Sequence, residues 1–465
     1  MSAVTTEDTP DSGQPAPPTP DGGSRGSGSF SLREVVAGNG MVTVLAIVLS
    51  LVISAILIIV TDEEVTEAAG YFFARPTDTI AAAWQAVAAA YAALFRGAVF
   101  NYQDDSFGDA IYPLMESLTV ATPLIIISLG IAISFRSGLF NIGGQGQMIF
   151  GAIFATWFGV HLQLPFGLHL LLVLIMGILG GAVWGAVVGV LKALTGAHEV
   201  ILTIMLNYVA VHFVTFLLYT PVLQREGSTN PVSAFLPETA QFPLLFGEAY
   251  RLNWGFVVAV LATVFAWWLM RRSTVGFQLR AVGANPHAAR TAGVSVKTMY
   301  VVAMATSGGL AGLAGMSQVA GTERMLNTDV AGSFGFDAIT VALLGRSSPV
   351  GVFAAGLLFG ALRAGGVTMQ TETGVPIDIV LIIQSLIVLF IAAPPLVRTI
   401  FRLPKPGALQ ERRTADPVVQ PVLAGDASAD ATGEAADDAG GEALGDAAAE
   451  EPEPSTTTPA EGEQR

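Results

Sequence analysis

The sequence contains no cysteine and no nucleotide-binding loop. Without cysteine the chain has no disulfide, no thiolate nucleophile and no cysteine-ligated metal. No G-x-x-x-x-G-K-[ST] segment is present to wrap phosphates, so the sequence offers no nucleotide-binding loop of this kind. The five histidines form no spacing that indicates a catalytic pair. We therefore expect no cofactor, no metal and no catalytic centre on this chain.

Charged side chains are also scarce. They make up 13% of the residues, hydrophobic residues make up 52%, and the mean hydropathy is +0.60. Soluble domains carry about a quarter charged residues. Long apolar segments must satisfy their backbone internally in a lipid bilayer, which helices do. The composition therefore predicts an all-α polytopic membrane protein.

Much of the net charge of −15 belongs to the two ends of the chain. Residues 1–40 and 401–465 hold 19 of the 37 acidic side chains but only 7 of the 22 basic ones. Both ends are rich in small and polar residues, so we expect disordered tails on either side of a membrane domain at 41–400. Because the acidity belongs to tails, it indicates no nucleic-acid partner.

Apolar segments recur about ten times between the tails. The segment 79–100 is only mildly hydrophobic and carries an aromatic stripe, so we expect it to lie on the outer surface, with a further span as the alternative. The ten crossings place both termini on one side. The expected crossings are 41–60, 116–135, 147–161, 168–191, 200–219, 254–270, 300–320, 334–345, 350–363 and 377–397.

The distribution of cations between the loops assigns that side to the cytoplasm. The loops on the opposite side carry many of the carboxylates, among them Asp104, Glu226, Glu248 and Asp329. The cytoplasmic loops carry the cations Arg136, Lys192, Arg346 and Arg398 and the basic segment 271–297.

The segment 137–147 reads SGLFNIGGQGQ. Gly143, Gly144 and Gly146 weaken a helix, and the three amides Asn141, Gln145 and Gln147 are costly in hydrocarbon. Irregular backbone at membrane depth is tolerated where it is buried in protein or lines a water-filled path. We expect a broken or re-entrant segment that lines a substrate path. The alternative is a tight cytoplasmic turn between two spans.

Three polar residues share one face of the next apolar helix. Glu199, Thr203 and Asn207 are spaced by four residues, so they face protein or water and not lipid. We expect them to line the translocation path. The alternative is structural, because Glu199 suits a helix N-terminus and the other two can make interhelical hydrogen bonds.

Glycines at intervals of four predict close helix packing in two segments. Small residues at this spacing let helices approach one another closely. The glycines concerned are Gly177, Gly181, Gly185 and Gly189 in the first segment and Gly308 and Gly312 in the second.

The basic segment 271–297 contains five cations and no carboxylate. Asn285 is suited to cap a helix, Pro286 to its first position and Gly293 to its left-handed end. These residues predict a helix of about two turns in a cytoplasmic loop. An ordinary basic loop that only sets topology is the alternative.

Four blocks together resemble a known family: GLFNIGGQGQ, HEVILTIMLNY, LRAVGANPHAARTAGV and FDAITVALLGRSSPVGVFAAGLLFGAL. The chain is similar, over about 106–396, to permease subunits of bacterial ABC importers for nucleosides and simple sugars, in the branched-chain amino acid and ribose permease superfamily. Its length resembles the larger of two paired nucleoside permeases. The family block usually has an acidic residue where Gln145 stands, which argues against proton or cation handling there.

The resemblance implies that residues 280–293, within a cytoplasmic coupling loop at 271–298, form the coupling helix that docks on a cytoplasmic ATP-binding subunit. ATP and magnesium would be held by that subunit. It further implies a bacterial cell membrane location, a second and shorter permease subunit, and an extracellular substrate-binding lipoprotein that meets 224–250 and 322–333. The residues expected to couple are Arg280, Gly283, Asn285, Pro286, Ala288, Ala289, Arg290 and Gly293.

We weighed three other classes of membrane protein. An ion-coupled secondary transporter needs intramembrane carboxylates, for which Glu116, Glu199 and Asp337 are the candidates. A channel would conduct without nucleotide, and an intramembrane enzyme would need a catalytic pair. The sequence favours an ATP-driven permease that carries a nucleoside or simple sugar by alternating access.

Overall fold

The structure is a computed structural model that describes residues 39–402. Within this range the regular elements are helices, and strand pairing is limited to isolated bridges between loops. The predicted all-α class is therefore confirmed for the described residues. The predicted tails lie outside them, except for residues 39–40 and 401–402 at their edges.

Eight helices of the described range are long and apolar enough to cross a membrane. A ninth crossing results if α15 (Asp378–Ala392) and α16 (Pro394–Ile400), which meet at 94°, are counted together. The expected set of about ten also included α6 (Gly144–His161) and the short α13 (Phe334–Leu344). The eight are α2 (Asn39–Thr61), α4 (Pro76–Ala98), α5 (Phe107–Arg136), α7 (Leu168–Thr195), α8 (Glu199–Leu218), α9 (Gly255–Arg272), α12 (Val296–Ser317, extended by the π-helix η2, Gln318–Thr322) and α14 (Pro349–Thr373).

Three predicted boundaries are wrong. The span expected at 116–135 begins earlier, because α5 starts at Phe107 after Ser106, whose side chain caps it. The span expected at 350–363 continues as α14 to Thr373, so Arg363 lies inside the helix and not at its end. The span expected at 377–397 breaks at Ala393, because Pro394 and Pro395 follow and proline disfavours helical backbone in the residue before it.

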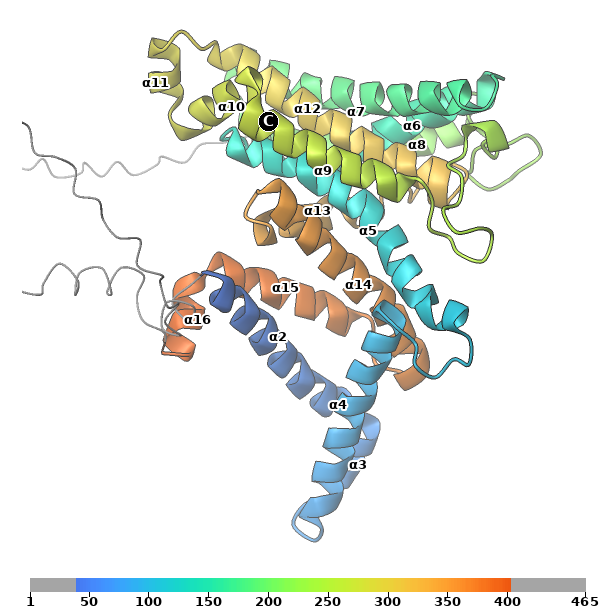
Figure 1. Cartoon of the computed structure of the whole chain (residues 1–465), viewed down its shortest axis with the longest axis vertical. Coiled ribbons are helices and arrows are strands. Elements are labelled where there is room, and N and C mark those ends of the chain that lie inside the picture. The colour runs from blue at the N-terminus through green and yellow to red at the C-terminus, as the bar shows by residue number, and fades with distance from the viewer. Residues whose placement is uncertain (1–38, 403–465) are drawn as a thin grey trace, which may run out of the picture. The chain divides into compact units, whose positions relative to one another are not determined.

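The segment expected to lie on the outer surface forms α4, which is preceded by the short α3 (Glu63–Ala69). Its length and composition also satisfy the criteria for a span. Figure 1 shows α4 running across the direction of α7, α9 and α12. Arg96 near its end pairs with Glu372 at the end of α14. The surface location of α4 remains a prediction.

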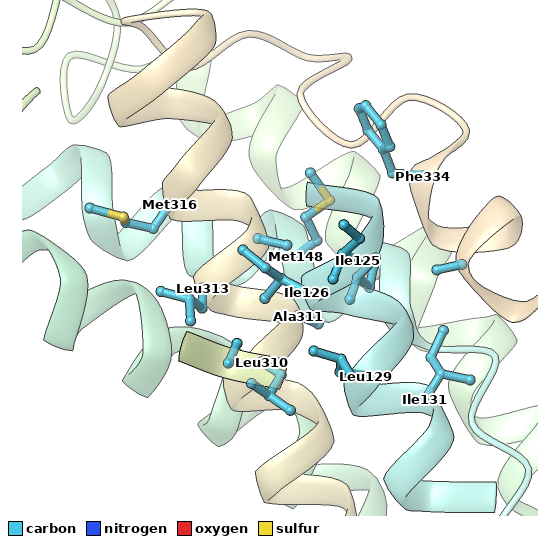
Figure 2. Packing of buried hydrophobic residues seen from close by; sticks show 14 of the residues in the cluster. Ile125, Ile126, Leu129, Ile131, Met148, Leu310, Ala311, Leu313, Met316 and Phe334 are labelled. Carbon is cyan, nitrogen blue, oxygen red and sulfur yellow. The ribbon is translucent and has the colours of Figure 1, made fainter. Parts of the chain in front are cut away.

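The largest apolar core surrounds α5 and α12, whose candidate membrane spans are 83% and 72% buried. Figure 2 shows Leu310 and Leu313 of α12 beside Ile126 of α5 and Met148 of α6. Helices that are apolar on all sides occupy the interior of a bundle. Helices α6, α7 and α9 pack around this pair, and a second apolar cluster joins α2, α4, α15 and the end of α14.

Helices α7 and α12 meet through the six glycines expected to allow close packing. A Cβ atom at Gly181 would overlap the carbonyl oxygen of Gly308, and one at Gly312 would overlap that of Gly177. Gly185 and Gly189 face the backbone of α12 in the same way. The two backbones are therefore in direct contact, and no larger side chain fits between them without a shift.

The two ends of the bundle differ. Figure 1 shows α10 (Thr274–Ala284), α11 (Pro286–Thr291), α16 and the start of α2 at one end. The long loops, including the 3-10 turn η1 (Glu238–Ala240), lie at the other. There, residue 233 donates its backbone N–H to the oxygen of Leu326 at 2.9 Å, which joins the two loops predicted to meet a binding protein.

Candidate functional site

The chain between α5 and α6 is a buried, non-helical segment. Helix α5 ends at Arg136, Gly138 has a φ of 76°, and helical structure resumes at Gly144. Asn141 in this segment is fully buried and donates a hydrogen bond to Ser307 Oγ, near the middle of α12, at 2.9 Å. The irregular backbone is therefore enclosed by protein, the condition under which such backbone is tolerated in a membrane.

Four polar side chains hold this segment in place. Asn141 Oδ1 accepts the backbone N–H of Gly143 at 2.8 Å, and Asn141 Nδ2 also donates to Gln147 Oε1 at 3.0 Å. Asn207 of α8 accepts from the N–H of Gly146 at 2.9 Å and donates to the carbonyl of Ile142 at 2.9 Å. We call Asn141, Gln147, Asn207 and Ser307 the amide network; it fastens α8 and α12 to the segment.

This arrangement bears on the predicted substrate path. Asn141, Gln147, Thr203 and Asn207 are all at most 5% exposed. Thr203 donates its hydroxyl to the carbonyl of Glu199 at 2.8 Å. For Asn207, the structure agrees with the structural alternative, because its side chain makes two hydrogen bonds to other parts of the chain. Contact of these four residues with substrate remains a prediction.

Glu199 and Gln145, the other two residues of the predicted path, are more accessible. Glu199 forms an ion pair with Lys192 Nζ at the end of α7, at 2.8 Å, and accepts a long hydrogen bond from the N–H of Phe140 at 3.5 Å. Gln145 is half-buried and lies against Gly335 at the start of α13. Glu199 of α8 is therefore linked both to the end of α7 and to the irregular segment.

The basic segment folds as two helices and not one. The small helix predicted from its capping residues is α11, where Asn285 Oδ1 accepts from the N–H groups of His287 and Ala288 at 2.9 and 3.1 Å. Gly293 has the expected left-handed conformation, with a φ of 84°. Helix α10 was not predicted from the sequence. Its signal is Ser273, whose side chain accepts a hydrogen bond from the N–H of Gly276 at 2.8 Å.

The residues expected to couple divide into two groups. Ala288 and Arg290 of α11 are exposed, as is the neighbouring His287, which was not among the expected residues, whereas Ala289 is 4% exposed and faces the core. A Cβ at Gly283 would overlap the carbonyl oxygen of Arg136 at the end of α5. The remaining expected residues are Arg280 and Pro286, which are half-buried, and Asn285 and Gly293, which are exposed.

Gly283 also places α10 in backbone contact with the irregular segment. A Cβ at Gly138 would lie 3.1 Å from the Cα of Gly283. The exposed helix α11 and the buried amide network are therefore joined by a short path through α10 and residues 138–141. A displacement of α10 has no free space at this contact and must move the segment.

A second polar region lies towards the long loops, between α5, η2, α13 and α14. Arg251 Nη1 pairs with Glu116 Oε1 at 2.9 Å, and Arg363 Nη1 pairs with Asp337 Oδ2 at 3.2 Å. Ser333 Oγ donates to Asp337 at 2.7 Å and accepts from Arg363 at 2.9 Å. Both arginines line two cavities of about 260 and 370 Å³. We call this region the outer cavity, after the predicted extracellular side of the long loops.

The ion pairs bear on the ion-coupled alternative. Glu116, Glu199 and Asp337, the three candidate carboxylates, each pair with an arginine or lysine. The positive charge already beside each carboxylate reduces its attraction for a transported cation. Arg251 and Arg363 were not predicted as site residues, because their partners Glu116 and Asp337 lie 135 and 26 positions away in the chain.

Comparison with known proteins gives a consistent result. The family model described as branched-chain amino acid transport system / permease component matches residues 114–392. Guanosine ABC transporter permease protein NupP of Bacillus subtilis (strain 168) is 39% identical over 69% of this chain and 90% of its own length. Glucose ABC transporter permease protein TsgB13 of Haloferax volcanii is 34% identical, over 69% and 83%.

A third relative is the nucleoside ABC transporter permease protein NupB of Lactococcus lactis subsp. cremoris (strain MG1363). It is 35% identical over 67% of this chain and 88% of its own length. No solved structure matches the chain. The match to the family model and the coverage of these relatives show that the chain belongs to the branched-chain amino acid transport system permease family and is a permease subunit of an ABC transporter.

Proposed function

We propose that this permease carries nucleosides, or closely related simple sugars, into a bacterial cell across the cell membrane. Two of the relatives above are named for guanosine or nucleosides and one for glucose. These substrates share uncharged, hydroxyl-rich groups. The observation that carries the proposal is the similarity to NupP over nine-tenths of that protein's length.

The energy for transport comes from ATP and magnesium on a cytoplasmic partner ATPase, which docks on α11. Exposed Arg290 and His287 form the contact surface, in the segment richest in cations. Both termini then lie in the cytoplasm. Helix α2 begins, and helix α16 ends, at the end of the bundle that carries α11 (Figure 1). A second permease subunit, a shorter paralogue, completes the transmembrane path, and an extracellular lipoprotein delivers substrate to the long loops.

Transport follows an alternating-access cycle. When the ATPase dimer closes, it moves α11 and α10, and the Gly283 contact transmits the displacement to residues 138–143. The amide network then moves α6, α8 and α12 together, because its hydrogen bonds join these helices. A path between this chain and its partner permease opens alternately to either side.

The test is uptake of a radiolabelled panel of guanosine, uridine and glucose in cells with and without this chain. We expect chain-dependent uptake of at least one compound, which disappears when the partner ATPase carries a substitution that prevents ATP hydrolysis. Uptake that persists without ATP hydrolysis and follows an ion gradient would contradict the proposal and support the secondary transporter.

The docking role of α11 has its own test. We predict that Arg290→Glu abolishes ATP-driven uptake by reversing a surface charge, while the purified permease keeps its thermal stability. The ATPase should no longer co-purify with it. Arg75→Glu, which reverses the charge of an exposed arginine outside the coupling loop, is the matched control. Normal uptake by Arg290→Glu would place the docking surface elsewhere.

A further inference from the structure

We propose that the outer cavity is a substrate-binding site of the permease itself and that it accepts uncharged polyhydroxylated ligands while it excludes their phosphates. This inference rests on the proposed transport function and assigns the site at which the transported molecule is held. The residues that line this cavity were not among those predicted to line the substrate path.

The first observation is the placement of charge. Arg363 lies inside α14 and Asp337 in the first turn of α13, and their side chains are only 36% and 21% exposed. Ionisable residues within membrane segments are costly and usually mark substrate or ion pathways. A second ion pair, between Glu116 of α5 and Arg251 of the loop before α9, lines the same cavity, although only 13% of the residues in the chain are charged.

The second observation is hydrogen-bonding capacity that the protein leaves unused. Glu116 Oε1 binds Arg251, but Glu116 Oε2 is buried and has no partner. Such an oxygen is costly unless a water or ligand donates to it. The two cavities share the side chains of Glu116, Arg251 and Arg363, so this oxygen belongs to a residue that faces both spaces.

The third observation is the size and lining of the space. The cavities of about 260 and 370 Å³ together reach the range of small-molecule sites. The first is lined by the amide of Gln318 and the carboxylates of Glu323 and Asp329. The second is bordered by Tyr112, whose ring is stacked on Tyr250 with centroids 6.3 Å apart. Carboxylates accept from sugar hydroxyls, arginine and amide groups donate, and the ring offers an apolar face.

The charge balance determines which ligands enter. Three carboxylates (Glu116, Glu323 and Asp329) line the first cavity beside two arginines, and Asp337 neutralises one of these from behind. The cavity is therefore net negative. A neutral nucleoside or sugar pays no Coulomb penalty there, whereas a nucleotide phosphate meets repulsion at short range and low dielectric.

The position of the outer cavity also links a bound ligand to the ATP-driven movement proposed above. Glu116 lies on α5 and Gln318 directly follows α12. The same two helices contact the irregular segment at their other parts, α5 through Arg136 and α12 through Ser307. Ligand held at one end of these helices is thus mechanically linked to the contact between α10 and the segment.

The test uses the purified complete transporter, with its ATPase and partner permease but without the binding protein. Saturable binding of tritiated guanosine and of tritiated glucose is measured, with guanosine 5′-monophosphate as competitor. We expect one of the two probes to bind, and the monophosphate to compete at least roughly tenfold more weakly than guanosine.

Two variants and a control locate the binding. Glu116→Gln should weaken binding roughly tenfold, the size expected for one charge-assisted hydrogen bond, and should improve competition by the monophosphate. The double variant Asp337→Asn, Arg363→Gln should weaken binding without leaving an unpaired charge. Glu248→Gln, an exposed carboxylate in the loop that carries Arg251, should bind as the wild type does.

Each outcome decides the question. If cells require the chain for uptake, but the wild-type complex binds neither probe at millimolar concentration or both cavity variants bind normally, the site is wrong and the transport function stands. Equal competition by the monophosphate also overturns the proposal. If the chain supports no uptake of any nucleoside or sugar, the proposed function fails first.

Discussion

The amide network and the outer cavity are both polar regions inside an apolar protein. They differ in charge, in burial and in whether their polar atoms have hydrogen-bond partners. The amide network is uncharged, and its members Asn141, Gln147, Asn207 and Ser307 bond to one another or to nearby backbone. The outer cavity is charged and partly exposed, and one carboxylate oxygen of Glu116 has no partner.

This difference teaches how to separate fold from function among buried polar groups. A satisfied group stabilises one arrangement of the chain, and its removal leaves its partners without hydrogen bonds. A group with free capacity beside a cavity is available to a ligand. Polar residues of the first kind should therefore affect stability when changed, and those of the second kind should affect binding and transport.

The largest expected effect on stability is that of Asn141→Leu. The substitution leaves the N–H of Gly143, the hydroxyl of Ser307 and the amide of Gln147 without a buried partner, which costs roughly 3 kcal/mol or more. Thermal unfolding of the purified permease in detergent measures it. Gln145→Leu, at a half-buried position in the same segment, is the control. An unchanged unfolding midpoint for Asn141→Leu would contradict the claim that the amide network stabilises the fold.

A somewhat smaller effect is expected for Asn207→Leu. It removes the two hydrogen bonds to Gly146 and Ile142 and should cost about 2 kcal/mol. Since these bonds join α8 to the irregular segment, hydrogen exchange in 140–147 should also increase. A variant that keeps its stability and shows altered substrate preference would instead support the predicted contact with substrate.

The smallest effect on stability is expected for Glu116→Gln. Its partner Arg251 is 54% exposed, so the ion pair contributes only about 0.5 kcal/mol, in the range measured for accessible pairs. The same unfolding assay should show a shift close to zero, although transport falls. A loss as large as that of Asn207→Leu would assign the outer ion pair to the fold.

The sequence was sufficient to predict the class, the helix α11 and close packing at the glycines of α7 and of α12, because each depends on local spacing. It did not predict that these two helices pack on each other. It was insufficient to predict the full length of α14. A charged residue such as Arg363 resembles the end of a span, and only the fold shows that Asp337 pairs with it. Helix α10 was missed because a basic, glycine-containing segment resembles a loop. Proline at 394 signals the break after α15, but apolar residues on both sides concealed it.

The roles of the polar residues could not be derived from sequence for a different reason. Spacing showed that Thr203 and Asn207 face protein or water, but a path-lining amide and a satisfied interhelical amide have the same pattern. Glu116 and Arg251 lie 135 positions apart, and no periodicity relates them. Only the fold shows which polar groups have partners.

The most direct test of the account measures thermal unfolding and guanosine binding on the same two variants of the complete transporter. We predict that Asn207→Leu lowers the unfolding midpoint by several degrees and leaves the guanosine affinity of the folded fraction within about twofold. Glu116→Gln should keep the midpoint and lose roughly tenfold in affinity. The reverse pattern, or equal effects on both properties, would contradict the distinction between the amide network and the outer cavity.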